Sequence, residues 1–277
     1  MRKKPTKGTL GWAWLLLGAS LLSLPTTGAG QAAPPAGTPK ASELRIGIAP
    51  VYPPIAMKED GQLKGVEVDF ANQLSKDLKV KVTFVELPWD GLIPALNDNR
   101  IDVIMSGMSI TPKRSEEVAF THPYLRVGQM VLIRRADYSK FRAGATMNAP
   151  TARVGFQTGT TGEAYARANL THAQLQAFPT PEAGIAALRA GQIDFFIHDA
   201  PTVWRVSGGF ERKDPELMGR YRLLTKEELA WAVRKGDTSL LDRLNGILQT
   251  WKKNGEIEHV LDRWIPVRKV TIDKPAH

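Results

Sequence analysis

The sequence contains no cysteine among its 277 residues. This absence excludes disulfide bonds and metal sites built from thiolates. It also excludes a lipid anchor on a cysteine behind an export leader. The five histidines lack the spacing of metal ligands, and we therefore expect neither a metal nor another cofactor.

Three other features are missing after residue 40. No apolar run reaches the roughly 20 residues of a membrane-spanning helix. The formal net charge is +9, but the basic residues are scattered and no groove-reading motif is present, so we expect no nucleic-acid partner. No Gly-x-Ser-x-Gly segment or other catalytic constellation is visible, and we predict that the protein is not an enzyme.

The N-terminus has the order of a secretory signal peptide. Basic residues at 2–7 precede an apolar stretch at 10–24, and small residues follow at 28–33. The apolar stretch of about 15 residues is shorter than a membrane span, although an uncleaved anchor is the alternative. We predict a signal peptide over 1–30 and a flexible, proline-rich linker over 31–42.

Strand and helix patterns alternate along the remaining chain. Leu44, Ile46 and Ile48 alternate as a strand, whereas Val66 and Phe70 begin an apolar run at helical spacing. Further strands are predicted at 80–85, 101–105, 131–133, 154–157 and 193–198, and further helices at 89–96, 162–168, 181–190, 239–253 and 257–264. This order predicts parallel sheets covered by helices, and about 240 residues exceed what one core usually organises, so we expect two α/β lobes.

One internal similarity indicates that both lobes share one plan. Residues 95–102 (ALNDNRID) and 187–194 (ALRAGQID) agree at four of eight positions, and each contains a helix end, a turn and a strand start. Chance is the alternative explanation. Because ligands of open α/β sheets bind at the carboxyl ends of strands, the similarity points to the loops at 106–109 and 198–200.

The first of these loops contains a helix start and a cation. Thr111 is a favourable N-cap, and Pro112 suits the first helical position. Gly107 lets the backbone approach a ligand closely. Arg114 offers a planar guanidinium that matches a carboxylate with two hydrogen bonds. The alternative for Arg114 is a surface ion pair with a neighbouring glutamate.

The second lobe offers hydroxyl groups and a carboxylate. Segment 158–163 (TGTTGE) precedes a helical pattern, and its backbone N–H groups suit an anion. It lacks the Gly-Lys-Ser/Thr ending of a phosphate loop, which argues against a nucleotide. Asp199 follows an apolar strand and could hold a ligand ammonium, the alternative being the N-cap of a helix at 201–206.

Two aromatic residues lie in loops next to predicted strands. Tyr52 lies among prolines, and Trp89 joins a strand to a helix. Rings in such loops form apolar walls for small ligands, although ordinary packing is the alternative for each.

Together these segments resemble the polar amino-acid family of bacterial periplasmic solute-binding proteins, over about Glu43 to Pro266. The segments that carry the resemblance are 65–70 (GVEVDF), 89–96 (WDGLIPAL), 106–114 (SGMSITPKR), 158–163 (TGTTGE) and 198–199 (HD). Their order and spacing make the resemblance specific, although Val66 replaces the larger residue usual at its position.

The resemblance implies a fold class and a division of the chain. The fold would be α/β, a two-lobed periplasmic-binding-protein fold (type II), with two hinge strands and a ligand in the cleft between the lobes. Lobe 1 is predicted over 43–129 and 230–268, lobe 2 over 130–229, and a C-terminal tail over 269–277.

It also implies roles for charged and backbone groups. Arg114 would bind an α-carboxylate, helped by the backbone at Gly107, Ser109 and Thr161. Asp199 would bind the α-ammonium of the same ligand.

The same resemblance places Tyr52 and Trp89 beside the ligand side chain. In relatives that take basic amino acids, an extra acid commonly precedes the first aromatic residue, whereas Ala49 stands there in this sequence. Gln157 could exchange hydrogen bonds with an uncharged polar side chain. We therefore predict a neutral polar amino acid, such as glutamine, over a basic one by at least about tenfold.

The expected partners are this amino acid and the membrane permease of an ABC importer. Because no cysteine can carry a lipid, we expect a monomer that moves freely in the periplasm. The alternative function is an exported cyclohexadienyl or arogenate dehydratase of the same fold, with Glu163 as its acid. Asp199, with an ammonium to bind, favours the receptor.

Overall fold

The structure is a computed structural model, and it describes residues 43–142, 147–208, 216–220 and 222–265. The predicted signal peptide, linker and C-terminal tail lie outside these residues. Within the described stretches, no helix combines the length and apolar character that crossing a membrane requires.

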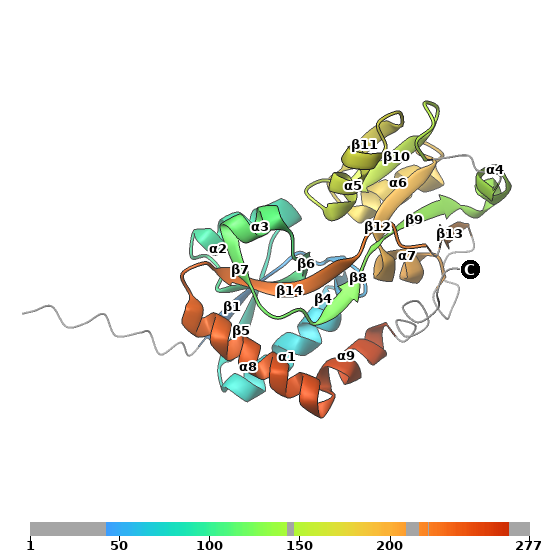
Figure 1. The fold of residues 1–277 in the computed structure, drawn as a ribbon. Helices are drawn as coiled ribbons and strands as arrows, with labels where there is room; N and C mark the ends of the chain where they lie inside the picture. Colours follow the sequence, from blue (N-terminus) through green and yellow to red (C-terminus); the bar gives the residue numbers. More distant parts are fainter. Residues whose placement is uncertain (1–42, 143–146, 209–215, 221, 266–277) are drawn as a thin grey trace, which may run out of the picture. The chain divides into compact units, whose positions relative to one another are not determined.

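The first lobe is built on a mixed sheet covered by helices on both faces (Figure 1). Its elements are β1 Glu43–Ile48, α1 Val66–Leu78, β5 Lys81–Glu86, α2 Leu92–Asn97, β6 Val103–Ser109, α3 Pro112–Glu117, β7 Val118–Phe120, β8 Leu125–Val127, β14 Glu227–Arg234, α8 Thr238–Asn254 and α9 Glu256–Trp264. The order is β5-β1-β6-β14-β7, with β8 also paired to β14. Strands β5, β1 and β6 are parallel, and β14 is antiparallel to β6. Helices α1, α8 and α9 pack on one face and α2 on the other.

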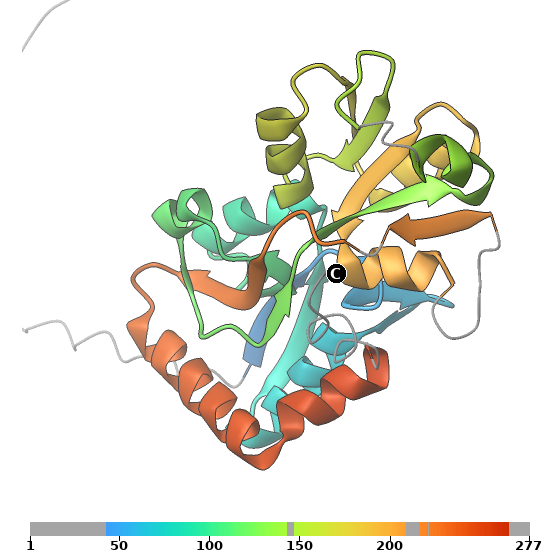
Figure 2. The same ribbon diagram turned by 45° about the vertical axis from the view of Figure 1, so that its right-hand side comes forward.

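A small antiparallel sheet extends this lobe. It consists of β2 Val51–Tyr52, β3 Ala56–Glu59 and β4 Gln62–Lys64. Figure 2 shows how α9 lies against α1 on the far side of the lobe's main sheet from α2.

The second lobe has a sheet of similar order. Its elements are β9 Gln129–Arg134, α4 Tyr138–Arg142, β10 Arg153–Gln157, α5 Thr161–Asn169, β11 Gln174–Phe178, α6 Pro181–Arg189, β12 Phe195–Asp199, α7 Ala200–Val206 and β13 Leu217–Arg220. The order is β11-β10-β12-β9-β13, with β11, β10 and β12 parallel and β9 antiparallel. Successive side chains of β12 point to opposite faces. Phe195 and Ile197 therefore pack with α5, and Phe196 packs with α6.

The predicted strands and helices are confirmed, with shifts at their ends that are largest in two of them. The strand predicted at 101–105 begins at Val103 and continues to Ser109, because β14 pairs with it up to that residue. The helix predicted at 89–96 begins with a 3-10 turn, Trp89–Gly91, before α2.

Two neighbouring segments connect the lobes. The chain passes from β8 to β9 and returns between β13 and β14. Gln129 N donates to Thr225 Oγ1 at 2.8 Å, and Leu224 N donates to the Gln129 carbonyl at 2.8 Å. Gly128 permits this approach, because a Cβ atom there would lie 2.1 Å from the Thr225 carbonyl oxygen. The two connections are thus joined to each other.

The internal similarity of the sequence corresponds to a repeated set of contacts. Arg45 donates from Nε to Asp102 Oδ2 at 3.0 Å and from Nη2 to Oδ1 at 2.7 Å. Arg153 makes the same two bonds to Asp194, at 3.0 and 2.7 Å. In both pairs the arginine backbone N–H also donates to Oδ2.

A second arginine repeats as well. Arg234 Nη1 donates to the Ile101 carbonyl at 2.7 Å, and Arg134 Nη1 donates to the Ile193 carbonyl at 2.5 Å. These arginines end the antiparallel strands β14 and β9. Because the two lobes share such detailed contacts, the internal sequence similarity is not due to chance, and both lobes have the same basic architecture.

Replacing Asp194 with alanine is expected to lower the free energy of unfolding by roughly 1–3 kcal/mol, because Arg153 loses its acceptor. Burial raises the pKa of Asp194, but the hydrogen bonds from Arg153 outweigh this and hold the pKa below its ordinary value. The stabilisation is therefore present above the ordinary aspartate pKa and is lost as the pH falls toward the folded value. Urea denaturation across this pH range measures the effect. Equal unfolding free energies at neutral pH for this variant and for Asp98→Ala, at an exposed aspartate, would contradict it.

Candidate functional site

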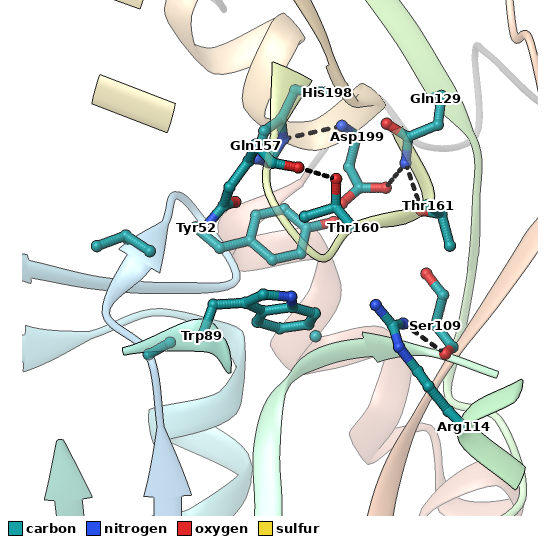
Figure 3. Close-up of a pocket in the computed structure, with 13 residues that line it drawn as sticks. Tyr52, Trp89, Ser109, Arg114, Gln129, Gln157, Thr160, Thr161, His198 and Asp199 are labelled. Carbon is teal, nitrogen blue, oxygen red and sulfur yellow. Dashed lines mark hydrogen bonds between the residues drawn. The ribbon is translucent and has the colours of Figure 1, made fainter. Parts of the chain in front are cut away.

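A cavity lies at the carboxyl ends of β6, β10 and β12, and both lobes line it (Figure 3). The residues predicted from the sequence all line it, namely Tyr52, Trp89, Gly107, Ser109, Arg114, Gln157, Thr161 and Asp199. The remaining lining residues are Ala49, Val51, Gln129, Thr160 and His198.

Arg114 is held by the helix start that the sequence predicts. Thr111 caps α3, its hydroxyl accepting from Arg114 N at 3.2 Å. The guanidinium donates to the carbonyls of Ser109 (2.8 Å) and Gly159 (3.1 Å), and it lies 5.2 Å from the centre of the Trp89 ring. Among the described residues, no carboxylate lies within ion-pairing distance of it. Burial lowers the pKa of Arg114, and the predicted alternative of a surface ion pair is wrong.

Asp199 ends β12 on the lobe 2 side of the cavity. It occupies the N-cap position of α7, but its side chain does not cap the helix. Instead, Oδ1 accepts from Gln129 Nε2 at 2.6 Å. Burial and the nearby carboxylate of Glu227 raise the pKa of Asp199 to about 7, against the opposing effect of Arg114. A cation beside Asp199 would relieve both costs.

The two predicted aromatic residues form part of the wall between the lobes. Trp89 Nε1 donates to the Gly159 carbonyl at 3.0 Å, so this lobe 1 ring contacts lobe 2. Tyr52 is buried and meets the His198 ring edge-on, with 5.4 Å between centres. The Tyr52 hydroxyl is buried beside the Asp199 carboxylate, and burial together with this negative charge raises the pKa of Tyr52 well above its ordinary value.

Two polar residues of the site were not found by sequence reasoning. Gln129 donates from Nε2 to Asp199 and, at 2.9 Å, to Thr161 Oγ1. Glu227 accepts from Ser109 Oγ at 2.6 Å and from Thr161 Oγ1 at 2.8 Å. Gln129 and Glu227 lie at the two connections between the lobes. The sequence signal nearby is Gly128, the residue before Gln129, which allows the two connections to approach each other closely.

Comparison with known proteins identifies the family. The model of bacterial extracellular solute-binding proteins, family 3, matches residues 44–267. This chain belongs to that family. Its fold is the two-lobed, type II fold of periplasmic binding proteins, with two hinge connections and a cleft between the lobes.

Named relatives of this solute-binding protein include transport receptors. The L-arginine-binding protein of Pseudomonas aeruginosa is 33% identical over 267 residues, which cover 90% of this chain and 95% of that protein. The binding component of an ABC transporter from Wolinella succinogenes, solved with lysine, is 31% identical with a TM-score of 0.76 and covers 82% and 97% of the two chains. An ancestral amino acid-binding protein, a precursor of cyclohexadienyl dehydratase, is 33% identical with a TM-score of 0.73 and covers 80% and 95%.

A buried carboxylate supports the backbone at Gly107, which lines the cavity of this solute-binding protein. Glu67, fully buried, accepts from Gly107 N and Tyr124 Oη at 2.7 Å and from Trp231 Nε1 at 2.8 Å. Burial raises its pKa to about 7, although these donors lower it. Gly107 has φ of 68°, and a Cβ there would lie 2.6 Å from the Tyr52 ring. Glu67 therefore fixes a backbone turn that only glycine fits.

Glu163, the acid that a dehydratase would use in the alternative function, is held by neighbouring donors. Its carboxylate accepts from Gly159 N at 2.7 Å and from Arg167 Nε at 2.8 Å, and it does not line the cavity. Although burial raises the pKa of Glu163, these donors outweigh it and lower the pKa below its ordinary value. A lowered pKa does not suit a general acid. Within the described residues, no cluster of three or more metal-ligating side chains occurs.

Proposed function

We propose that this protein is the substrate-binding component of an ABC importer and that it captures a polar amino acid between its lobes. One observation carries the proposal. Arg114 from lobe 1 and Asp199 from lobe 2 line the same cavity, and no carboxylate in the described chain pairs with Arg114. A zwitterion offers a carboxylate to one and an ammonium to the other.

In this proposal the α-carboxylate lies on Arg114 and on the backbone at Gly107, Ser109 and Thr161. Arg114 suits it because a guanidinium binds a carboxylate with two parallel hydrogen bonds. The α-ammonium lies on Asp199, whose pKa is raised by burial and by the nearby Glu227 carboxylate, so a cation beside it would be favourable.

The side chain of the ligand would lie between Tyr52 and Trp89. At this end, Ala49 and Val51 line the cavity, and Gln157 supplies an amide. Asp199 is the only carboxylate in the described lining, and the α-ammonium takes it. These residues support an uncharged polar side chain, such as that of glutamine.

A second candidate, a basic amino acid, is favoured by one observation. Glu227 lies behind Ser109 and Thr161, so the site holds one cation against two carboxylates. A ligand with a positive side chain would balance this charge. The arginine relative from Pseudomonas and the lysine-bound structure from Wolinella support the same class.

Competition calorimetry separates these two candidates. We expect L-glutamine to bind at least about tenfold more tightly than L-arginine, a difference of roughly 1.4 kcal/mol. The physical reason is the cost of burying a guanidinium without a carboxylate partner at the Ala49 end. Displacement of glutamine by an equal concentration of arginine or lysine would contradict this and favour the basic ligand.

Two measurements test the receptor function itself. Native mass spectrometry of the purified protein should reveal a copurified amino acid, and a thermal-shift screen of the standard amino acids should show stabilisation by mass action. Failure of every amino acid to stabilise the protein would overturn the proposal. Accumulation of an aromatic product from prephenate or arogenate would support the dehydratase instead.

The remaining parts of the proposal concern place and partner. A free monomeric receptor in the periplasm would deliver the amino acid to a membrane permease. The lobes would comprise 43–129 with 230–268, and 130–229, since the joined connections at Gly128 and Thr225 support a hinge there. Closing on a ligand held by both lobes is the motion expected of such a hinge.

A further inference from the structure

Glu227 accepts hydrogen bonds from three hydroxyl groups beside the cavity. Its Oε2 accepts from Ser109 Oγ at 2.6 Å and from Thr161 Oγ1 at 2.8 Å, and its Oε1 accepts from Thr225 Oγ1 at 2.6 Å. Gln129 Nε2 lies 3.3 Å from Oε1. Three hydroxyl donors around two oxygens are the environment of an ionised carboxylate.

The direction of these hydrogen bonds follows from counting protons. A hydroxyl group has one proton to donate. Thr161 Oγ1 accepts from Gln129 Nε2 at 2.9 Å, so its own proton is free for Glu227. Thr225 Oγ1 likewise accepts from Gln129 N at 2.8 Å. Since a carboxylate can only accept, Ser109 must also donate to it.

As a consequence, the Ser109 and Thr161 hydroxyls act toward the cavity as hydrogen-bond acceptors and not as donors. Both line the cavity, and with their protons turned to Glu227 they offer it oxygen lone pairs. Thr161 Oγ1 and the Asp199 carboxylate both accept from Gln129 Nε2, so they lie close together. The cavity therefore presents acceptors at this point, which match a group that only donates.

We propose that Glu227 is a positioning residue that makes this part of the site specific for an ammonium group. It holds the Ser109 and Thr161 hydroxyls as acceptors and adds a negative charge beside Asp199. The inference rests on the proposed function and extends it. The site accepts 2-amino acids and rejects 2-hydroxy acids, whose oxygen lone pairs would face those of the two hydroxyls and both carboxylates.

The test compares two ligands that differ only at this group. Calorimetry is run with the strongest-binding standard amino acid, which we expect to be L-glutamine, and with the 2-hydroxy acid that carries the same side chain. The wild-type protein is expected to favour the amino acid by at least about 100-fold, or roughly 2.7 kcal/mol. Glu227→Gln, whose amide donates to a hydroxyl and frees that proton, is expected to reduce this ratio at least tenfold.

The ratio distinguishes positioning from a purely structural role. Loss of hinge structure would weaken both ligands equally and leave the ratio unchanged, which would overturn the inference. Glu228→Gln is the matched control, because Glu228 is adjacent and pairs instead with Arg126 at 3.2 Å. Its ratio is expected to equal that of the wild type. A reduced ratio in Glu228→Gln would also count against a specific role for Glu227.

A second variant covers the case in which Glu227→Gln does not fold. Ser109→Ala removes one oriented acceptor and is expected to reduce the same ratio. An unchanged ratio in Ser109→Ala would then overturn the inference. A wild-type protein that binds none of the standard amino acids would overturn the proposed function and the inference with it. A wild-type protein that binds one, with an unchanged variant ratio, overturns the inference alone.

Discussion

Replacing Arg114 with alanine is expected to weaken amino-acid binding by about 3–5 kcal/mol, because the variant leaves the buried α-carboxylate without its cation. A ligand bound at 1 μM has a binding free energy of about −8.2 kcal/mol, so a loss of about 4 kcal/mol leaves roughly millimolar affinity. The lost attraction is strong because Arg114 is buried, and this burial lowers the pKa of its guanidinium despite the nearby carboxylates of Asp199 and Glu227. Isothermal titration calorimetry measures the change directly.

Two control variants test whether the loss of binding is specific to the guanidinium of Arg114. Arg114→Lys keeps the charge but loses the planar fork and cannot reach both carbonyls that the guanidinium now contacts, so an intermediate affinity is expected. Lys113→Ala removes an exposed neighbouring cation and should bind as the wild type does. Near-native affinity in Arg114→Ala, with a normal melting temperature, would remove the α-carboxylate from this position.

The sequence predicted the main elements of the fold because their side chains repeat with the period of a strand or a helix. The apolar alternation of β1, the apolar run of β12 and the helical spacing of α1 and α8 depend only on local burial. Short strands such as β7, β8 and β13 escaped prediction, since three or four residues contain too little pattern. Strand β11 escaped because most of its side chains are polar or exposed at the sheet edge.

In the candidate site, too, some residues could be predicted from local sequence patterns and others could not. Arg114 and Thr161 stand at helix starts with recognisable caps, and Asp199 follows an apolar strand, so local motifs located them. Gln129 and Glu227 reach the cavity only because two distant connections run beside each other, which no local pattern encodes. Glu67 was visible as part of a family motif, but its contact with Gly107 depends on tertiary packing.

Amino-acid binding is expected to weaken as the pH falls below about 7, and Asp199 is the proposed cause. Burial raises the pKa of Asp199 to about 7 in the free protein, and an ammonium beside it favours the ionised form. Binding at lower pH must therefore release a proton, so affinity falls by up to about tenfold per pH unit and is level above neutrality. Calorimetry in buffers of different ionisation enthalpy measures both the affinity and the protons released.

The variant Asp199→Asn separates this titration from others nearby. The amide keeps an oxygen for Gln129 but carries no charge, so binding at slightly alkaline pH should weaken by about 3–5 kcal/mol and lose its dependence on Asp199.

Of the other ionisable groups facing Asp199, His198 has a pKa lowered by burial to about 4, and Tyr52 has one raised above its ordinary value. Arg114 keeps its proton throughout this range, whereas Glu67, beneath Gly107, also has a pKa raised by burial to about 7. Any slope that survives in Asp199→Asn therefore reports a group other than Asp199, such as Glu67, and a slope equal to that of the wild type would contradict an ammonium contact at Asp199.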